Sequence, residues 1–153
     1  MPDPDIHDGG CSCGAVRYCT LGQPAKTAVC HCSYCPTRTG SAFGVSVYFL
    51  GANLEQLSGE LKDYTFETES GRGFTTRFCT TCGTTVFWSL AMTPDLTWVA
   101  GGTFDPPTFW HPVSREIFTQ SAAPFAHTDL PEKHATTASY VPVHDDDARP
   151  KGV

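Results

Sequence analysis

The sequence has little positive charge and no long apolar run. Its 153 residues include 10 Lys and Arg against 16 Asp and Glu, which gives a formal net charge of -6, and no basic stripe interrupts this balance. Because nucleic-acid binding requires clustered Lys and Arg to neutralise phosphates, we expect no nucleic-acid partner. The longest apolar-leaning stretch, 41–52, is too short to span a bilayer, so we expect no membrane partner.

A secretory signal is also missing from the sequence. The N-terminal stretch MPDPDIHDGG has neither the basic segment nor the apolar segment of a signal peptide. We therefore expect a cytoplasmic protein. In that reducing compartment disulfides are rare, and cysteines at short spacing are more often metal ligands. The oligomeric state is not predicted by any feature of the sequence.

No segment carries a helical hydrophobic stripe over three turns, whereas short alternating segments are frequent. The strongest is 42–50, in which Phe43, Val45, Val47 and Phe49 share one side at a period of two. The chain also contains 14 Gly and 12 Pro, which separate further candidate strands at 15–20, 61–66, 74–78, 85–90, 97–100 and 115–119. This pattern predicts a mainly β fold of short strands with few helical turns, packed as a sandwich or barrel.

The length of the chain suits one domain. Residues 1–8 are acidic and contain Pro, and we predict that they form a flexible arm. A single domain is expected over 9–143. The polar sequence HDDDARPKGV predicts a disordered tail at 144–153.

The eight cysteines fall into three clusters and one single residue. The clusters are CSC at 11–13, CHCSYC at 30–35 and CTTC at 79–82. Zinc favours tetrahedral coordination by thiolates, and a glycine after a ligand, such as Gly83, helps the backbone turn around the ion. The economical partition is one closed, structural four-thiolate site made of Cys11, Cys13, Cys79 and Cys82.

The middle cluster then offers Cys30, Cys32 and Cys35, with no fourth cysteine at a matching spacing. An open fourth position is typical of a catalytic zinc. Three alternatives remain: a redox pair of Cys32 with Cys35, plain core thiols, or a partition in which Cys30 joins the first site. His31 alternates with its neighbours, so we expect it to point away from them, and it is only a weak candidate for proton transfer. The single Cys19 is interpreted as an inert buried thiol.

Several longer stretches resemble one protein family. They are GGCSCGAVRY, VCHCSYC with TGSAFG, SGELKDY, RFCTTCGTTVFW and WVAGGTFDPP, in this order. They are similar to the glutathione-dependent formaldehyde-activating enzyme (GFA) family, also called the centromere protein V/GFA domain family. The resemblance implies an Mss4-like (β-tent) zinc fold with short antiparallel sheets. It also implies two zinc ions per chain, a structural one on Cys11, Cys13, Cys79 and Cys82 and a catalytic one on Cys30, Cys32 and Cys35.

The same resemblance implies a substrate and a reaction. Glutathione would be the thiol substrate of a carbon–sulfur lyase that makes or breaks S-(hydroxymethyl)glutathione, with formaldehyde as the other partner. A thiol that enters an open zinc position loses its proton, and the thiolate is the nucleophile or, in reverse, the leaving group. Two alternatives are a lyase for a different thiol conjugate and a non-enzymatic Mss4-like interaction module, which needs only the closed site.

One departure from the family concerns the residue after the third cysteine of the middle cluster. Family members often carry a basic residue there, whereas Pro36 and Thr37 precede Arg38 in this chain. Because glutathione has two carboxylates, arginines are candidate contacts through paired hydrogen bonds, namely Arg38, Arg72 and Arg77. Backbone N–H groups near the metal are further candidates, at Thr39, Gly40 and Ser41. Histidines in Pro-flanked sequence are interpreted as surface residues: His111, His127 and His134.

Overall fold

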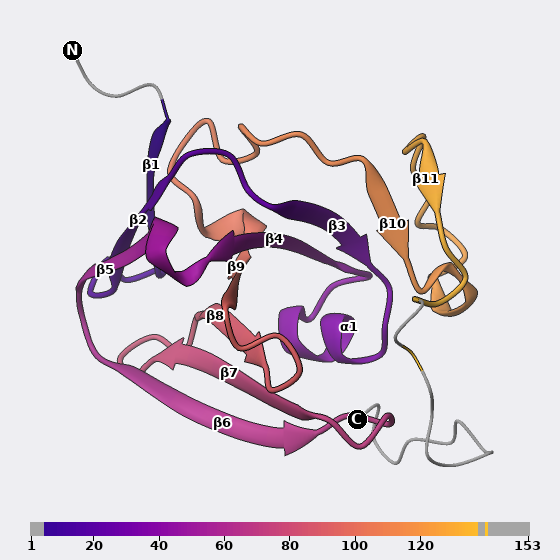
Figure 1. Cartoon of the computed structure of the whole chain (residues 1–153), viewed down its shortest axis with the longest axis horizontal. Coiled ribbons are helices and arrows are strands. Elements are labelled where there is room, and N and C mark those ends of the chain that lie inside the picture. Colours follow the sequence, from indigo (N-terminus) through magenta and orange to yellow (C-terminus); the bar gives the residue numbers. More distant parts are fainter. Residues whose placement is uncertain (1–4, 138–139, 141–153) are drawn as a thin grey trace.

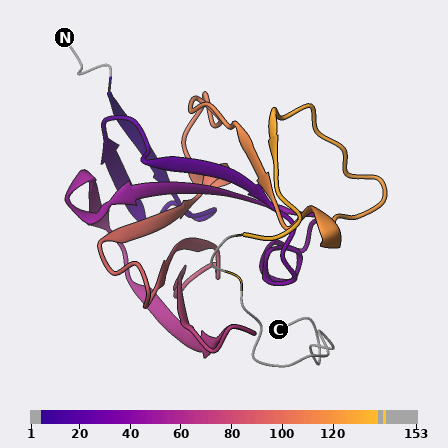
Figure 2. The same ribbon diagram turned by 45° about the vertical axis from the view of Figure 1, so that its right-hand side comes forward.

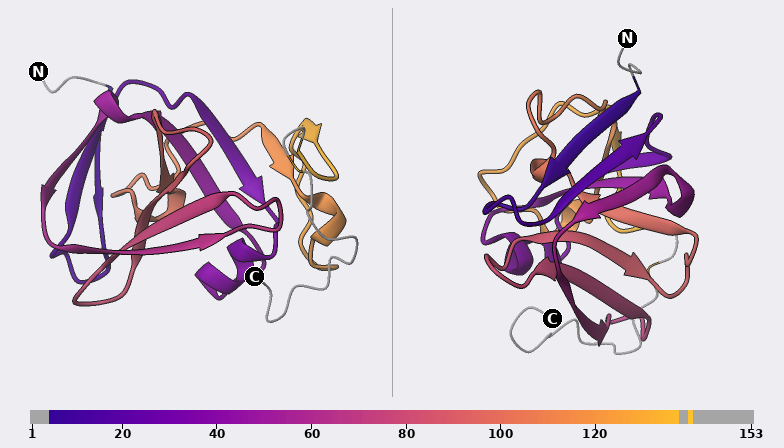
Figure 3. Two further views of the ribbon diagram at one scale, coloured as in Figure 1. Left: turned by 60° about the horizontal axis from the view of Figure 1, so that its bottom comes forward. Right: turned by 90° about the vertical axis from the view of Figure 1, so that its left-hand side faces the viewer.

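The computed structural model of the chain describes residues 5–137 and 140, and these form two sheets. The smaller sheet has the order β1 (Ile6–Gly10), β2 (Arg17–Leu21) and β5 (Leu54–Ser58). The larger sheet has the order β11 (Glu132–Lys133), β10 (Arg115–Ile117), β3 (Lys26–Cys30), β4 (Gly44–Leu50), β9 (Leu96–Ala100), β8 (Thr85–Leu90), β7 (Gly73–Cys79) and β6 (Leu61–Glu67). The smaller sheet lies at one end of the molecule, and β10 and β11 lie at the other (Figure 3).

Helical structure is sparse in the described part of the chain. It consists of α1 (Tyr34–Thr39) and the 3-10 turns η1 (Gly51–Asn53), η2 (Gly101–Thr103) and η3 (Thr119–Ser121). Helix α1 ends at Gly40, whose φ of 66° lies in the left-handed region that glycine adopts without steric cost. None of these helices has the length and hydropathy needed to cross a bilayer. The mainly β fold with few helical turns is therefore confirmed.

Each candidate strand from the sequence overlaps a strand of the structure, with bounds that differ by no more than two residues. The sequence did not predict β1, β3, β5 and β11. Residues 6–8 pair with β2 as part of β1, so they belong to a sheet and not to a loose arm. The predicted tail at 144–153 lies outside the described residues.

Most strand pairings are antiparallel, and those of β10 are parallel. Strand β10 pairs in parallel with both β3 and β11. A parallel pair needs a long connection to return the chain to the same end of the sheet. The chain reaches β10 through the long segment 101–114, and this segment permits the parallel direction.

The main core lies between the two sheets. On the larger sheet Val47 and Phe49 of β4 pack with Val99 and Phe87, and Tyr18 of β2 packs against this cluster from the smaller sheet. The hydroxyl of Tyr18 lies 2.9 Å from that of Thr103. The backbone at Gly9 runs directly over the Tyr18 ring, where a Cβ atom would collide with the Tyr18 hydroxyl. The close approach of the two strands thus requires glycine at this position.

The opposite face of the larger sheet is also buried and is aromatic. Tyr48 of β4 is opposite Trp98 of β9 in the register, and their ring centroids are 4.4 Å apart. Helix α1 lies over this second face, between the ends of β3 and β4 and the β6–β7 hairpin (Figures 1 and 2). Its Tyr34 ring is 4.9 Å from that of Phe66 and 5.9 Å from that of Phe74. The middle cysteine cluster is held on this face.

Candidate active site

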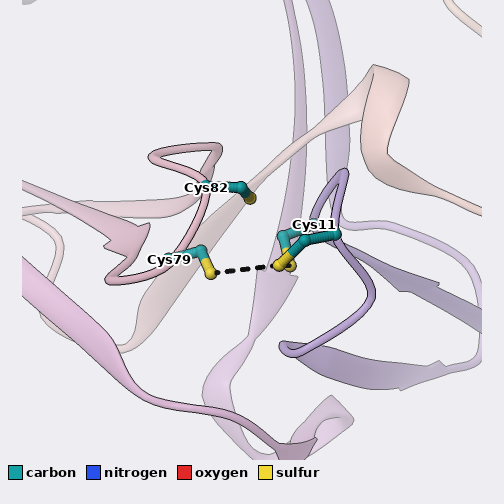
Figure 4. A group of neighbouring side chains, drawn as sticks. Cys11, Cys79 and Cys82 are labelled. Atoms are coloured by element: carbon teal, nitrogen blue, oxygen red, sulfur yellow. Dashed lines mark hydrogen bonds between the residues drawn. The ribbon is translucent and has the colours of Figure 1, made fainter.

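Four cysteines meet where the two sheets approach each other. Cys11 and Cys13 follow β1, Cys79 ends β7, and Cys82 lies in the turn before β8. Figure 4 shows Cys79 and Cys82 of this turn opposite Cys11. The four Sγ atoms lie within 4.8 Å of one another, with 3.5 Å between Cys11 and Cys13 and 3.8 Å between Cys13 and Cys79. Tetrahedral zinc with Zn–S bonds of about 2.3 Å places its sulfurs roughly 3.8 Å apart, so the donor set fits zinc.

Two similar turns build this four-cysteine set. Gly14 and Gly83 each follow a cysteine and each have a φ of 77°. The Gly14 N–H donates to the Cys11 carbonyl at 3.1 Å, and the Gly83 N–H donates to the Cys79 carbonyl at 2.9 Å. A hydrogen bond from the Thr84 hydroxyl lowers the pKa of Cys82 to about 5. The turns thus aim the sulfurs at a common centre and favour a thiolate there.

The second set is Cys30, Cys32 and Cys35, at the end of β3 and in the start of α1. Their Sγ atoms lie within 4.8 Å of one another, and those of Cys32 and Cys35 are 3.5 Å apart. Side-chain hydrogen bonds with Cys30 and Cys35 lower the pKa of Cys32 to about 3. In residues 5–137 and 140, no fourth His, Cys, Asp or Glu completes this set. The three donors fit zinc with one position left open.

His31 lies between two of these cysteines but faces the other way. It is buried, and its Nε2 donates to Oε1 of Glu116 at 2.6 Å. The other carboxylate oxygen of Glu116 accepts from the Thr128 hydroxyl at 2.8 Å and from Nζ of Lys133 at 2.7 Å. Burial raises the pKa of Glu116, but the hydrogen bonds from Lys133, Thr128 and His31 outweigh this effect and hold the pKa at about 2. The ionised carboxylate of Glu116 therefore holds His31 on the side away from the sulfur atoms, and with it the segment that carries Cys30 and Cys32.

Arg38 points inward beside the three-cysteine set. Its guanidinium carbon lies 4.1 Å from the centroid of the Trp88 ring, a cation–π geometry. At Gly44 a Cβ atom would lie 2.7 Å from Nη2 of Arg38 and 3.2 Å from Sγ of Cys35. Both side chains thus fill the space that a side chain at position 44 would need. The half-buried guanidinium of Arg38 therefore lies near Cys35.

The neighbouring N–H groups proposed from the sequence as substrate contacts have partners within the chain. The Gly40 N–H donates to the Pro36 carbonyl at 2.8 Å, and the Ser41 N–H donates to the Thr39 hydroxyl at 3.2 Å. The Thr39 hydroxyl donates to the Cys35 carbonyl at 2.7 Å. These bonds close the end of α1. Arg38, Thr39, Gly40 and Ser41 do not line the pocket described next.

A pocket of about 480 Å³ opens beside the three-cysteine set, on the aromatic face of the larger sheet. Cys30 and Cys32 line it together with the cationic residues Lys26, Arg72 and Arg115. Arg72 was predicted from the sequence as a substrate contact, whereas Lys26 and Arg115 were not. The spacing of four residues between Lys26 and Cys30 could have indicated Lys26, because residues four apart in a strand share a face. Arg77, the third arginine named, is absent from the lining and pairs with Asp63 at 3.5 Å.

Other residues named from the sequence lie elsewhere. His111 is only 3% exposed and packs against Phe104 and Trp110, so the expectation of a surface histidine was wrong. His127 and His134 are exposed, as expected. Cys19 lies in β2 but is half-buried, which corrects the expectation of a buried thiol.

Fold and cysteine geometry together define a class, a mainly β protein with one closed and one open cysteine set suited to zinc. The family model described as glutathione-dependent formaldehyde-activating enzyme (GFA) matches residues 6–121, and the chain belongs to this family. The resemblance found in the sequence is thereby confirmed. Members of the family are generally carbon–sulfur lyases.

One solved structure shows the same fold. It is the crystal structure of a Rhodobacter sphaeroides protein, a Northeast Structural Genomics target, with a TM-score of 0.52 and 23% sequence identity. The match covers 68% of this chain and 95% of that chain. None of the curated proteins compared with the chain matches it.

Proposed function

We propose that the protein is a zinc-dependent carbon–sulfur lyase that makes or breaks S-(hydroxymethyl)glutathione or a related thiol adduct. The observation that carries this proposal is the three-cysteine set, which has no fourth ligand among the described residues and borders a pocket lined in part by Lys26, Arg72 and Arg115. Cys30, Cys32 and Cys35 would hold the catalytic zinc, and Cys11, Cys13, Cys79 and Cys82 a structural one. When bound, the catalytic zinc supplies a positive charge that favours the thiolate form of a substrate sulfur.

The cationic residues of the pocket suit the carboxylates of glutathione. Lys26 and Cys30 lie on the same face of β3, and their separation of four residue steps corresponds to about 13 Å along the strand. An extended tripeptide is roughly 10 Å long, so a glutathione with its sulfur near Cys30 brings a carboxylate within reach of the Lys26 side chain. Arg115, on the adjacent strand β10, offers a second and bidentate partner.

Tyr48 is the residue in the pocket best suited to contact the reacting oxygen. It is 5% exposed, lines the pocket and packs in the same cluster as Cys30 and Cys35. Burial raises the pKa of its phenol, so the hydroxyl keeps its proton at neutral pH. In our proposal the Tyr48 Oη donates a hydrogen bond to the oxygen of the carbonyl or of the adduct, and this bond strengthens as negative charge develops on that oxygen.

Zinc content tests the metal part of the proposal. Wild type should contain about two zinc ions per chain, and Cys32→Ala should contain about one while it stays folded through the closed site. The matched control is Cys19→Ala, which removes a cysteine outside both sets and should keep both ions. One ion per chain in wild type and in Cys32→Ala alike would contradict the open site.

Exchange between glutathione and formaldehyde, followed by NMR, tests the reaction. Zinc-loaded wild type and Cys19→Ala should accelerate the exchange, and Cys32→Ala should not. An unchanged exchange rate with wild type would redirect the assignment to a different thiol conjugate or to a non-enzymatic zinc-binding interaction module.

A further inference from the structure

The pocket beside the three-cysteine set has two unlike walls. The cationic residues Lys26 and Arg115 come from β3 and β10, which are neighbours at one side of the larger sheet. The opposite wall is mainly apolar and comes from β9, β8, β7 and the turn after β8; its residues are Leu96, Trp98, Leu90, Phe74 and Met92. Arg72 lies beside this wall, with its Nη1 3.1 Å from Sδ of Met92. Tyr48, on the strand between the two groups, separates the walls.

The apolar wall is a continuous surface built by strand register. Phe74 is opposite Leu90, and Trp98 is opposite Tyr48. The Phe74 and Trp98 rings meet edge to face with centroids 6.2 Å apart. Leu96 extends this surface by one more position on the same side of β9. The wall therefore presents rings and branched side chains to whatever occupies the pocket.

Glutathione and formaldehyde alone do not match this wall. Glutathione carries two carboxylates, an ammonium group and two amides, and burying these groups against apolar side chains leaves them without hydrogen-bond partners. Formaldehyde adds only one carbon and one oxygen to the sulfur. The volume of about 480 Å³ is in the range of pockets that hold drug-sized ligands, so space remains beside a bound glutathione.

We propose that the carbonyl half of the adduct is an aldehyde with an aromatic or large apolar group, which packs against Trp98 and Phe74. This inference rests on the proposed lyase function and names its substrate class. The glutathione half occupies the cationic wall, and the sulfur lies at the three-cysteine set between the two walls.

The chemistry is balanced without any further reactant. In the adduct RS–CH(OH)–R′, the carbon–sulfur bond breaks and its electron pair stays on sulfur. The O–H electron pair forms the second bond of the new C=O group, and the released proton ends on sulfur. The products are the thiol RSH and the aldehyde R′CHO, and no atom is oxidised or reduced. The group R′ takes no part in these steps, so only its binding surface distinguishes this substrate from the formaldehyde adduct.

Stable thioethers test the apolar wall separately from turnover. S-benzylglutathione and S-methylglutathione lack the hydroxyl group and cannot be cleaved in this way. Calorimetric titration of zinc-loaded wild type should show tenfold or more tighter binding of the benzyl compound, as expected for burial of a phenyl ring. Equal affinities for the two compounds would overturn the inference.

Two substitutions test where on the protein the benzyl group binds. Phe74→Leu removes a ring from the wall and should reduce the benzyl-to-methyl affinity ratio several-fold. Phe109→Leu is the matched control, because Phe109 is 60% exposed and does not line the pocket, and it should keep the wild-type ratio. A ratio that Phe74→Leu leaves unchanged would place the benzyl group elsewhere and would overturn the inference.

Exchange measurements distinguish a failure of the inference about the aldehyde from a failure of the proposed lyase function. We expect wild type to accelerate exchange between glutathione and phenylacetaldehyde more than exchange between glutathione and formaldehyde. Equal or greater acceleration with formaldehyde would overturn the inference and leave the lyase function standing. Acceleration with neither aldehyde would overturn the proposed function itself.

Discussion

Replacing Glu116 with glutamine removes the negative charge at the centre of a buried cluster behind the three-cysteine set. The carboxylate accepts hydrogen bonds from His31, Thr128 and Lys133 at 2.6, 2.8 and 2.7 Å. Its side chain is only 3% exposed, so water cannot replace these partners. The Glu116→Gln amide keeps the shape of the side chain but leaves the Lys133 ammonium without its counter-charge.

The size of the effect follows from the pKa of Glu116. The pKa falls from 4.5 to about 2 on folding. At about 1.4 kcal/mol per pKa unit, this shift corresponds to roughly 3 kcal/mol of folding free energy at neutral pH. Because the folded-state pKa is the lower one, this stability is fully present above about pH 4.5 and is lost as the pH falls toward 2. The difference between wild type and Glu116→Gln should shrink over the same range.

Urea unfolding of the zinc-loaded proteins, repeated between pH 7 and about pH 3, measures this difference. Zinc release at acid pH affects both proteins, so the comparison between them isolates the carboxylate. Glu132→Gln is the control, because Glu132 pairs with His134 with a side chain 53% exposed and should cost less than about 1 kcal/mol. A loss for Glu116→Gln no larger than that for Glu132→Gln would refute the reasoning.

Two further predictions concern the core and the pocket. Gly9→Ala should lower the free energy of unfolding by about 1–3 kcal/mol, because its Cβ would lie 2.6 Å from the Thr103 carbonyl and closer still to the Tyr18 hydroxyl. Gly102→Ala, with nothing within 4 Å, should stay within about 0.5 kcal/mol of wild type, and equal losses in urea would contradict the crowding at Gly9. Tyr48→Phe should lower kcat/KM of the glutathione exchange by about a hundredfold. Tyr64→Phe changes a residue that is 60% exposed and should leave kcat/KM unchanged. Similar kcat/KM values for the two variants would show that Tyr48 has no role in the reaction.

The sequence best predicted strands whose two faces differ in polarity and metal sites whose possible ligands can be counted. Val45, Val47 and Phe49 alternate with other residues, and β4 was predicted from this alternation. The cysteine partition was predictable because four donors close a tetrahedral site and three do not. Strand β3 was missed because its residues 27–30 are all buried, which removes the period-two signal.

The surroundings of the site depend on contacts that are distant in the sequence. Glu116 reaches His31 across 85 residues, and no local pattern distinguishes it from a solvated glutamate. The inward direction of Arg38 depends on the absence of a side chain at Gly44. The apolar wall joins residues from β7, β8 and β9, and its continuity follows from register, which the sequence does not specify.

The closed cysteine set also affects when, during synthesis, a metal ion can cross-link the two ends of the set. Cys13 and Cys79 are 66 residues apart, so an ion bound by both ends closes a long loop. By the entropy of loop closure, a cross-link of this length disfavours the unfolded chain by about 4 kcal/mol. In the proposed closed site, an ion would join the two turns only after Cys82 has left the ribosome. The cross-link between the two sheets would therefore form only after strands β1 to β7 have been synthesised.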